Sequence, residues 1–268
     1  MEQPLKILFV INDLYTRGNG LAASARRTIA LLREQGHHVR VLSALPRDGD
    51  DCGVGMPEYV LPPLRIPLVD PLIASQGYAF ARAKRREIER ALAWADVVHL
   101  EEPFYLQAVV ARYARRRGVP VVATYHIHPE NLTASVCLDR ALPLNRAILE
   151  LWKRAIFNRS DLVQCPSRSV YERASKLCVR APLLLLSNGV PLGEEMSGGG
   201  HEVGESSVVR VLVVGRFSRE KDQATILRAL RHSARARSIQ LTFAGRGPTE
   251  HSLRASARRL LRRGVIAH

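Results

Sequence analysis

Cysteine, aromatic residues and long apolar runs are all scarce in this sequence of 268 residues. The four cysteines are widely spaced and form no C-x-x-C pair, which indicates neither a disulfide framework nor a zinc site. Aromatic residues make up only 6% of the chain and no recognised nucleic-acid module is present, so we expect no nucleic-acid partner. No apolar run approaches the length of a membrane-spanning helix. The run at residues 5–11 is too short for the core of a signal peptide, which predicts a cytoplasmic protein.

Lysine is also scarce, although the chain is strongly basic. Only five of the 40 Lys and Arg residues are lysines, and the formal net charge is +15. Such a charge favours phosphate-rich partners or an anionic membrane surface. Arginine runs at 82–86, 115–117 and 258–263 fall on predicted helices, where a solvated helix face is the alternative explanation. Among functional partners, the sequence favours an anionic membrane, with the protein peripheral at the inner face of the cell membrane.

Short aliphatic runs alternate with segments of helical periodicity, which predicts an α/β protein. A strand over 5–11, a helix with its apolar positions between 21 and 32, and a strand over 39–42 form a βαβ unit with a right-handed crossover. The same alternation continues and predicts a Rossmann-like domain with a parallel sheet. Further strands are predicted over 59–61, 96–100, 119–124, 161–165, 183–186, 208–214 and 239–244, and further helices around 88–95, 104–117, 148–156, 226–234 and 253–261.

A segment rich in Gly, Glu and Ser separates two predicted domains. We expect an N-terminal domain over 1–190, a flexible linker over 191–207 and a C-terminal domain over 208–268. The C-terminal domain contains only a β-α-β-α pattern. Because a parallel sheet buried on both faces usually carries five or six strands, this second Rossmann-like domain is expected to be partial.

The strand over 208–214 breaks at Gly215 and opens into a basic loop that carries Arg216 and Lys221. Ligands of open α/β sheets bind beyond the carboxyl ends of the strands, and a following helix N-terminus favours negative charge. The pattern therefore predicts an anion site, with two merely solvated cations as the alternative.

Two further segments follow predicted strands. Gly18-Asn19-Gly20 fits the start of a G-x-G-x-x-A dinucleotide pattern, but its first glycine lies several residues past the strand, and the second strand ends without an acidic residue. An anion or sugar cradle is the interpretation that remains. His126, His128 and Glu130 alternate and would share one face of an extended chain, which permits a metal site, a site for a hydroxylated ligand, or a purely structural role. Glu101 and Glu102 end the neighbouring strand, either to bind a hydroxyl group or as loop carboxylates.

Taken in order along the chain, these segments resemble the retaining GT-B glycosyltransferases of family 4. Residues 215–221 are similar to the G-R-x-x-x-E-K donor motif of that family, and residues 245–248 to its G-x-G-P turn, with Arg246 where aspartate is frequent. Residues 187–190 match the N-G-V that precedes the crossing between domains. Residues 19–27 and 125–131 resemble a bacterial subgroup.

The resemblance implies two Rossmann-like domains facing across a cleft, with the acceptor on the first and a nucleotide-diphosphate sugar on the second. Arg216 and Lys221 would bind the donor diphosphate and stabilise the leaving group, and His126 would lie near the reacting sugar. No metal or other cofactor is implied. The remaining implied residues are Gly18, Gly20, Gly215, Gly245 and Gly247 for the donor, and Glu101, Glu102, His128, Glu130 and Asn131 for the acceptor.

One family element is missing from the sequence. The acidic E-x7-E element that follows the G-x-G-P turn has no counterpart in the residues after Pro248. We therefore expect a chain truncated in its C-terminal domain, with little or no transferase activity. The parent reaction would transfer a sugar with retention to a lipid or saccharide acceptor. The alternatives are a non-catalytic binding module, a Rossmann oxidoreductase, and a GT-B sugar-nucleotide epimerase.

Overall fold

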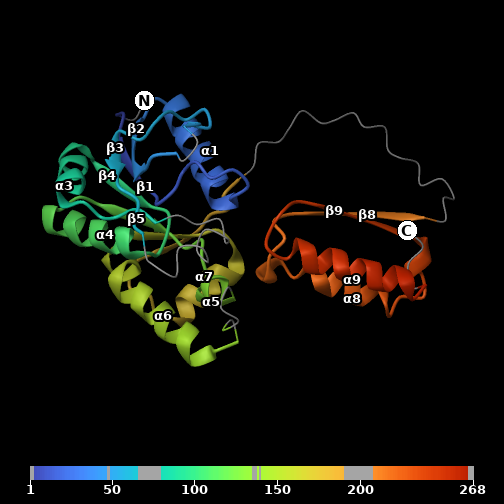
Figure 1. The fold of residues 1–268 in the computed structure, drawn as a ribbon. Helices are drawn as coiled ribbons and strands as arrows, with labels where there is room; N and C mark the ends of the chain where they lie inside the picture. The colour runs from blue at the N-terminus through green and yellow to red at the C-terminus, as the bar shows by residue number, and fades with distance from the viewer. Residues whose placement is uncertain are drawn as a thin grey trace. The chain divides into compact units, whose positions relative to one another are not determined.

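The computed structural model describes residues 3–46, 49–65, 80–134, 138, 140–189 and 208–264. The chain divides into two compact units, Met1–Gly189 and Val190–His268 (Figure 1). Each unit has its own sheet and its own hydrophobic core. The predicted linker at 191–207 lies outside the described residues.

The first unit is built on seven parallel strands in the order β3-β2-β1-β4-β5-β6-β7, which confirms the predicted α/β class (Figure 1). The chain moves from β1 toward β3 in one direction and from β4 toward β7 in the other. The neighbours β1 and β4 therefore form the topological switch point of the sheet. The strands are β1 Lys6–Val10, β2 His38–Ala44, β3 Tyr59–Leu61, β4 Val97–Leu100, β5 Val121–Thr124, β6 Leu162–Cys165 and β7 Leu183–Leu185.

Helices contact both faces of this sheet, and the alternation of side chains along β1 shows which helices contact which face. Phe9 packs with Ala25 and Ile29 of α1. Leu8 and Val10 point the other way and belong to the larger core that α3, α4, α6 and α7 cover. These helices are α1 Gly20–Glu34, α3 Arg85–Trp94, α4 Tyr105–Arg117, α6 Leu142–Ala155 and α7 Arg168–Lys176.

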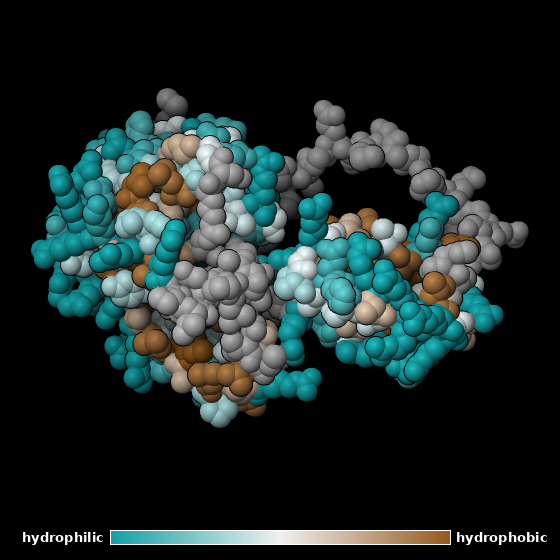
Figure 2. Space-filling model, in the orientation of Figure 1, coloured by the Kyte–Doolittle hydropathy of each residue, from teal (hydrophilic) through white to brown (hydrophobic). Residues whose placement is uncertain are grey.

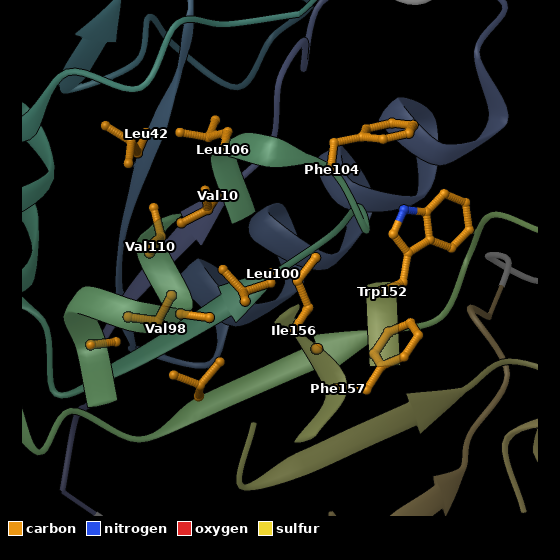
Figure 3. Packing of buried hydrophobic residues seen from close by; sticks show 14 of the residues in the cluster. Val10, Leu42, Val98, Leu100, Phe104, Leu106, Val110, Trp152, Ile156 and Phe157 are labelled. Atoms are coloured by element: carbon orange, nitrogen blue, oxygen red, sulfur yellow. The ribbon is translucent and has the colours of Figure 1, made fainter. Parts of the chain in front are cut away.

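The larger core joins α4 and α6 to the centre of the sheet, as Figure 3 shows. Val110 of α4 and Val98 of β4 are fully buried in it. The rings of Phe104 and Trp152 meet edge to face, with their centroids 6.2 Å apart. Burying an aliphatic side chain of this size contributes roughly 1.5–3 kcal/mol relative to exposing it, so this cluster is a main source of the stability of the unit.

The predicted helix boundaries follow from capping residues. Asn19 Oδ1 accepts hydrogen bonds from the first backbone amides of α1, and Gly118 ends α4 in the left-handed conformation. Two helices did not appear in the sequence pattern. One is α5, Pro129–Thr133, which is too short to show a period, and the other is α7, in which only Val170 and Ala174 are buried.

The second unit has two parallel strands, β8 Val209–Val214 and β9 Ile239–Ala244, with α8 Gln223–Leu230 and α9 Glu250–Arg262 on one side (Figure 1). These elements confirm the predicted β-α-β-α pattern. Phe217, Leu227 and Leu253 form the centre of a small core between the helices and the sheet. Because this sheet has two strands and its helices lie on one side, apolar side chains on the strands stay uncovered: Leu212 is 65% and Val214 is 74% exposed.

The Gly-x-Gly turn after β9 packs against the loop that leaves β8. Phe217 N donates to Arg246 O at 2.9 Å, and Thr249 N donates to Phe217 O at 3.1 Å. A Cβ atom at Gly245 would lie 1.9 Å from Gly215 O, and one at Gly247 would lie 2.2 Å from Phe217 O. Both glycines are therefore needed for contact between two loops of the chain itself. Their predicted role in admitting a nucleotide stays a prediction.

Replacing Gly247 with alanine is expected to destabilise the second unit by at least about 2 kcal/mol, because the backbone must move to admit the methyl group. Both tryptophans, Trp94 and Trp152, belong to the first unit, so hydrogen exchange of residues 208–264 is the suitable measurement. Exchange there should accelerate while tryptophan fluorescence still reports an unchanged first unit. Gly20→Ala is the matched control, since the added methyl group meets nothing within 4 Å. Unchanged exchange in the Gly247 variant would contradict the packing role.

Candidate functional site

Polar side chains gather where the parallel strands of the first unit end. Asn12 follows β1, Glu101 and Glu102 follow β4, His126 follows β5 and Asn188 follows β7. Carboxyl ends of parallel strands lie at the same edge of the sheet, and the switch point between β1 and β4 is the usual ligand position at that edge. The structure brings the predicted residues Glu101 and His126 into contact there.

A carboxylate and an imidazole form the centre of this edge. His126 Nε2 lies 3.0 Å from Glu101 Oε2, and the Asn188 side-chain amide lies 3.4 Å from His126 Nδ1. An amide N–H that donates to Nδ1 leaves the ring proton on Nε2, where it is donated to the carboxylate. The imidazole is thus held at both nitrogens. Asn188 lies in the Asn-Gly-Val segment noted for its resemblance, but no role for it followed from the sequence.

Burial and the neighbouring imidazoles set the protonation of this cluster. Burial lowers the pKa of His99, whose Nε2 lies 3.6 Å from Glu101 Oε1 and 2.8 Å from Thr124 Oγ1. Burial alone raises the pKa of Glu101. The nearby His99 and the hydrogen bond with His126 outweigh it, so the net pKa lies below the ordinary value. Glu101 is therefore a carboxylate at neutral pH, ready to orient His126 or a hydroxyl group.

Glu102 has a different environment from its neighbour. Its Oε2 accepts hydrogen bonds from Asn12 N at 2.7 Å, from Asn12 Nδ2 at 2.6 Å and from Gln107 Nε2 at 2.9 Å. Asn12 Oδ1 in turn accepts from Ala81 N at 2.9 Å. Glu102 is 5% exposed and holds the ends of β1 and β4 together. Its predicted contact with an acceptor stays a prediction.

The glycine loop before α1 lies at the same edge of the sheet. Gly18 has a φ of +76°, and Asn19 caps the helix that begins at Gly20. A Cβ atom at either glycine would meet nothing within 4 Å, so both leave the approach to the N-terminus of α1 open. This geometry suits the predicted anion or sugar cradle.

The extended face proposed for His126, His128 and Glu130 ends at Pro129, where α5 begins. Glu130 instead forms an ion pair with Arg173 of α7 at 2.7 Å. Within the described ranges, no group of three or more His, Cys, Asp or Glu side chains is arranged to hold a metal ion. The prediction that the three side chains share one extended face is therefore wrong, because proline at the first helical position turns the chain away from the extended conformation.

The polar side chains near α5 differ in whether their atoms have partners. Asn131 Oδ1 accepts from His128 N at 3.2 Å, and the ring of His128 packs on Tyr125 with centroids 5.2 Å apart. Tyr125 Oη and Glu130 Oε2 are buried without a hydrogen-bond partner among the described residues. Buried polar atoms are normally satisfied, so these two are suited to a polar ligand or an ordered water. Sequence reasoning missed Tyr125 and Arg173, because only the fold brings α7 to this edge.

In the second unit, Arg216 and Lys221 lie in the loop between β8 and α8. Gln223 Nε2 donates to Arg216 O at 2.8 Å, which fixes the backbone there. Lys221 is exposed and ends the short 3-10 helix Arg219–Lys221, just before Asp222 and the start of α8. Gly215 leaves β8 with a φ of +151°.

Three oxygen atoms near this loop were not identified from the sequence. Ser218 Oγ, Gln223 Oε1 and Thr249 Oγ1 are buried without a partner among the described residues. Ser218 is 1% and Gln223 is 3% exposed. They lie in the loop after β8, at the start of α8 and just after the Gly-x-Gly turn. Each can form a hydrogen bond, in addition to the charge that the two cations supply.

Residues 18–194 match a family model described as Glycosyltransferase Family 4. A search of curated protein sequences found no match.

Solved structures share the fold. HepE of Anabaena, in complex with UDP and glucose, is 15% identical with a TM-score of 0.56, over 97% of this chain and 67% of that chain. The catalytic domain of starch synthase IV from Arabidopsis thaliana, bound to ADP and acarbose, is 11% identical with a TM-score of 0.51, over 97% and 72%. The likeness extends to the fold alone, and it confirms the predicted GT-B fold class.

Glu102 generates a prediction about stability. Burial raises the pKa of Glu102 to about 7, against the hydrogen bonds from Asn12 and Gln107. A carboxyl group whose pKa rises on folding stabilises the folded state. This stabilisation is fully present below the pKa of the unfolded state, near 4.5, and it is lost as pH rises through the pKa of the folded state, about 7. The contribution is about 3 kcal/mol at most.

Glu102→Gln keeps the shape and the accepting oxygen but cannot ionise. The variant should therefore melt several degrees higher than the unaltered chain at pH 8 and close to it at pH 5. Thermal unfolding followed by tryptophan fluorescence at both pH values is the measurement. Equal differences at the two pH values would show that Glu102 does not titrate in this range. Glu34→Gln, an exposed glutamate at the end of α1, is the control.

Proposed function

The chain belongs to glycosyltransferase family 4, and from this premise we propose that it binds a nucleotide-diphosphate sugar. We propose that its parent reaction transfers the sugar, with retention, to a hydroxylated lipid or saccharide acceptor, and the sequence predicts that any turnover by the chain itself is low. The observation that carries the proposal is the Glu101–His126–Asn188 cluster at the switch point of the first sheet. We propose further that this takes place in the cytoplasm, at the inner face of the cell membrane.

The second unit is the proposed donor site. Arg216 and Lys221 supply two positive charges beside the start of α8, where a diphosphate gains both from the cations and from the free amides of the helix. The unpartnered oxygens of Ser218, Gln223 and Thr249 offer hydrogen bonds to hydroxyl groups of the ribose or sugar. Two proteins of this fold carry UDP or ADP in their structures, which supports a nucleotide here.

Sugar transfer leaves a nucleoside diphosphate with an added negative charge. Cations held in place before the reaction stabilise that charge as it develops, which lowers the barrier to breaking the glycosidic bond. Arg216 and Lys221 are placed for this role, so we expect no divalent metal to be required.

The first unit is the proposed acceptor site. The ionised Glu101 orients His126, and both face the edge where a ligand binds. A hydroxylated acceptor can donate its proton to the Glu101 carboxylate there, and Tyr125 and Glu130 offer further polar contacts. Glu102 fixes the backbone beneath them.

An oxidoreductase has no comparable support. The end of β2, where a carboxylate would hold the ribose of a dinucleotide, carries Ser43, whose hydroxyl group contacts Asn12 O at 3.4 Å. A binding module without turnover remains the alternative to the transferase, and the kinetic measurement below separates the two.

Arg216→Ala should weaken nucleotide binding at least about tenfold, because a charge-assisted contact to the diphosphate is lost. Isothermal titration with UDP, ADP and GDP measures this without requiring turnover. Arg216→Lys should restore part of the affinity, and Arg258→Ala, an exposed arginine on α9, is the matched control. Equal affinity in the Arg216→Ala and Arg258→Ala variants would contradict the diphosphate role.

His126→Ala should leave nucleotide affinity within about twofold and reduce turnover at least about a hundredfold, because the oriented imidazole acts in the reaction and not in holding the donor. Release of nucleotide from UDP-glucose, ADP-glucose and GDP-mannose gives the rate. His38→Ala, an exposed histidine at the start of β2, is the matched control. Nucleotide binding without release from any donor, in the unaltered chain, would favour the binding module.

A further inference from the structure

Helix α6 of the first unit is apolar on both of its sides. Its inner side buries Asn145, Leu149 and Trp152 against the core. Its outer side presents Leu144 and Leu151, which with Ala147 between them follow the helical period. A helix on the surface of a globular domain normally turns one apolar stripe inward and a polar face outward, so a second apolar stripe needs an explanation.

The leucines at the start of α6 and on its outer side are well exposed. Leu142 is 73%, Leu151 is 62% and Leu144 is 40% exposed. Leu138, just before the helix, is 46% exposed and is linked to it by the hydrogen bond from Ala141 N to Leu138 O. Figure 2 shows hydrophobic surface gathered at the lower end of the first unit, where Figure 1 places α6. These four leucines are termed the α6 patch.

Positive charge lies beside the α6 patch. Helix α6 and the cleft beside it carry five cationic side chains and two carboxylates. Both carboxylates already have partners: Glu130 pairs with Arg173, and Glu150 pairs with Lys153 and Arg154. The cations are Arg146, Lys153, Arg154, Arg173 and Lys176.

A cleft of about 790 Å³ lies between α6 and α7. Leu142, Leu149 and Leu177 give it apolar walls, and the exposed Arg146 and Lys176 line it as well. An apolar cleft with cations among its lining residues is complementary to a molecule with an anionic head and a hydrocarbon chain.

We propose that the α6 patch and its surrounding cations dock the protein on an anionic lipid bilayer. The leucines enter the boundary between headgroups and acyl chains, and the cations contact lipid phosphates. No helix among the described residues is both long enough and apolar enough to span a bilayer. A protein partner fits less well, because aromatic anchors are enriched at the centres of protein interfaces, whereas the α6 patch consists of leucines alone.

This docking deepens the proposed function and rests on it for its purpose, since a lipid acceptor would lie in that same bilayer. Helix α5, which carries the unpartnered Glu130 Oε2, connects His126 to the segment that precedes α6, and Glu130 also lines the cleft. The α6 patch would thus hold the acceptor edge of the sheet close to the membrane. Binding to vesicles requires no turnover, so the docking and the transferase reaction fail in separate experiments.

Vesicle sedimentation with the full chain tests the docking. The protein should bind vesicles of phosphatidylcholine with 30% phosphatidylglycerol much more strongly than pure phosphatidylcholine, and less as salt is raised from roughly 0.05 to 0.5 M. Leu142→Ser with Leu144→Ser and Leu151→Ser should reduce the partition coefficient at least about tenfold. Arg146→Glu with Lys176→Glu should reduce it at least about tenfold as well.

Matched control variants test whether vesicle binding depends on where the substituted leucines and cations lie, and not only on their number. Leu5→Ser, Leu31→Ser and Leu45→Ser together remove three leucines that are exposed elsewhere on the same unit, and Arg116→Glu with Arg117→Glu reverses two exposed charges on α4. Both controls should keep most of the binding, and circular dichroism should show every variant folded.

Three outcomes would overturn the proposal. One is no binding to anionic vesicles, and another is equal loss in the patch variants and the controls. The third is a concentration-dependent dimer, in sedimentation velocity, that the leucine substitutions abolish while vesicle binding persists.

Discussion

The buried hydrogen bonds between Asn12 and Glu102 are the interaction on which the candidate site depends. They join the ends of β1 and β4, the two parallel strands between which the strand order reverses. Such a switch point leaves an opening at the carboxyl edge, and a buried carboxyl group with three donors keeps that opening in one shape. With Glu102 directed inward, the preceding Glu101 is free to face His126. The protonation of Glu102 therefore links the stability of the fold to the geometry of the site.

Each unit places its candidate site beyond the carboxyl ends of its parallel strands, but by different means. In the first unit, side chains from several strand ends contact one another, and a large core holds those strands in register. In the second unit, the core is small, and backbone contact between two loops fixes the position of Arg216. Glycine makes that contact sterically allowed. A single change at such a glycine should therefore matter more to the second unit than a single change on its surface.

The positive charge of the chain acts at three scales. The net charge of +15 gives a long-range attraction to anionic surfaces. On α6 the charge lies beside exposed leucines, a combination suited to a lipid interface. In the loop after β8, two cations beside a helix start suit a diphosphate. A transferase that takes a charged soluble donor and an acceptor held at a membrane would use all three.

Much of the fold was predictable, because burial imposes a period on the sequence. The aliphatic runs determined the strands, and Gly118 determined where α4 ends. Helices α5 and α7 were not predictable from period alone, since one is five residues long and the other buries only two side chains. The resemblance gave roles to Arg216, Lys221 and His126, but it gave none to Ser218 or Asn188, although both lie within the matched segments, and none to Arg173.

Glu101 and Glu102 show what the sequence determines and what it does not. By itself the sequence determined that two carboxyl groups end a buried strand, since composition and period are properties of the chain alone. Only the tertiary structure decided that one faces His126 with a lowered pKa and the other faces Asn12 with a raised one. The physical reason is that successive side chains at a strand end point to opposite sides, and each pKa is set by the burial and partners on its own side.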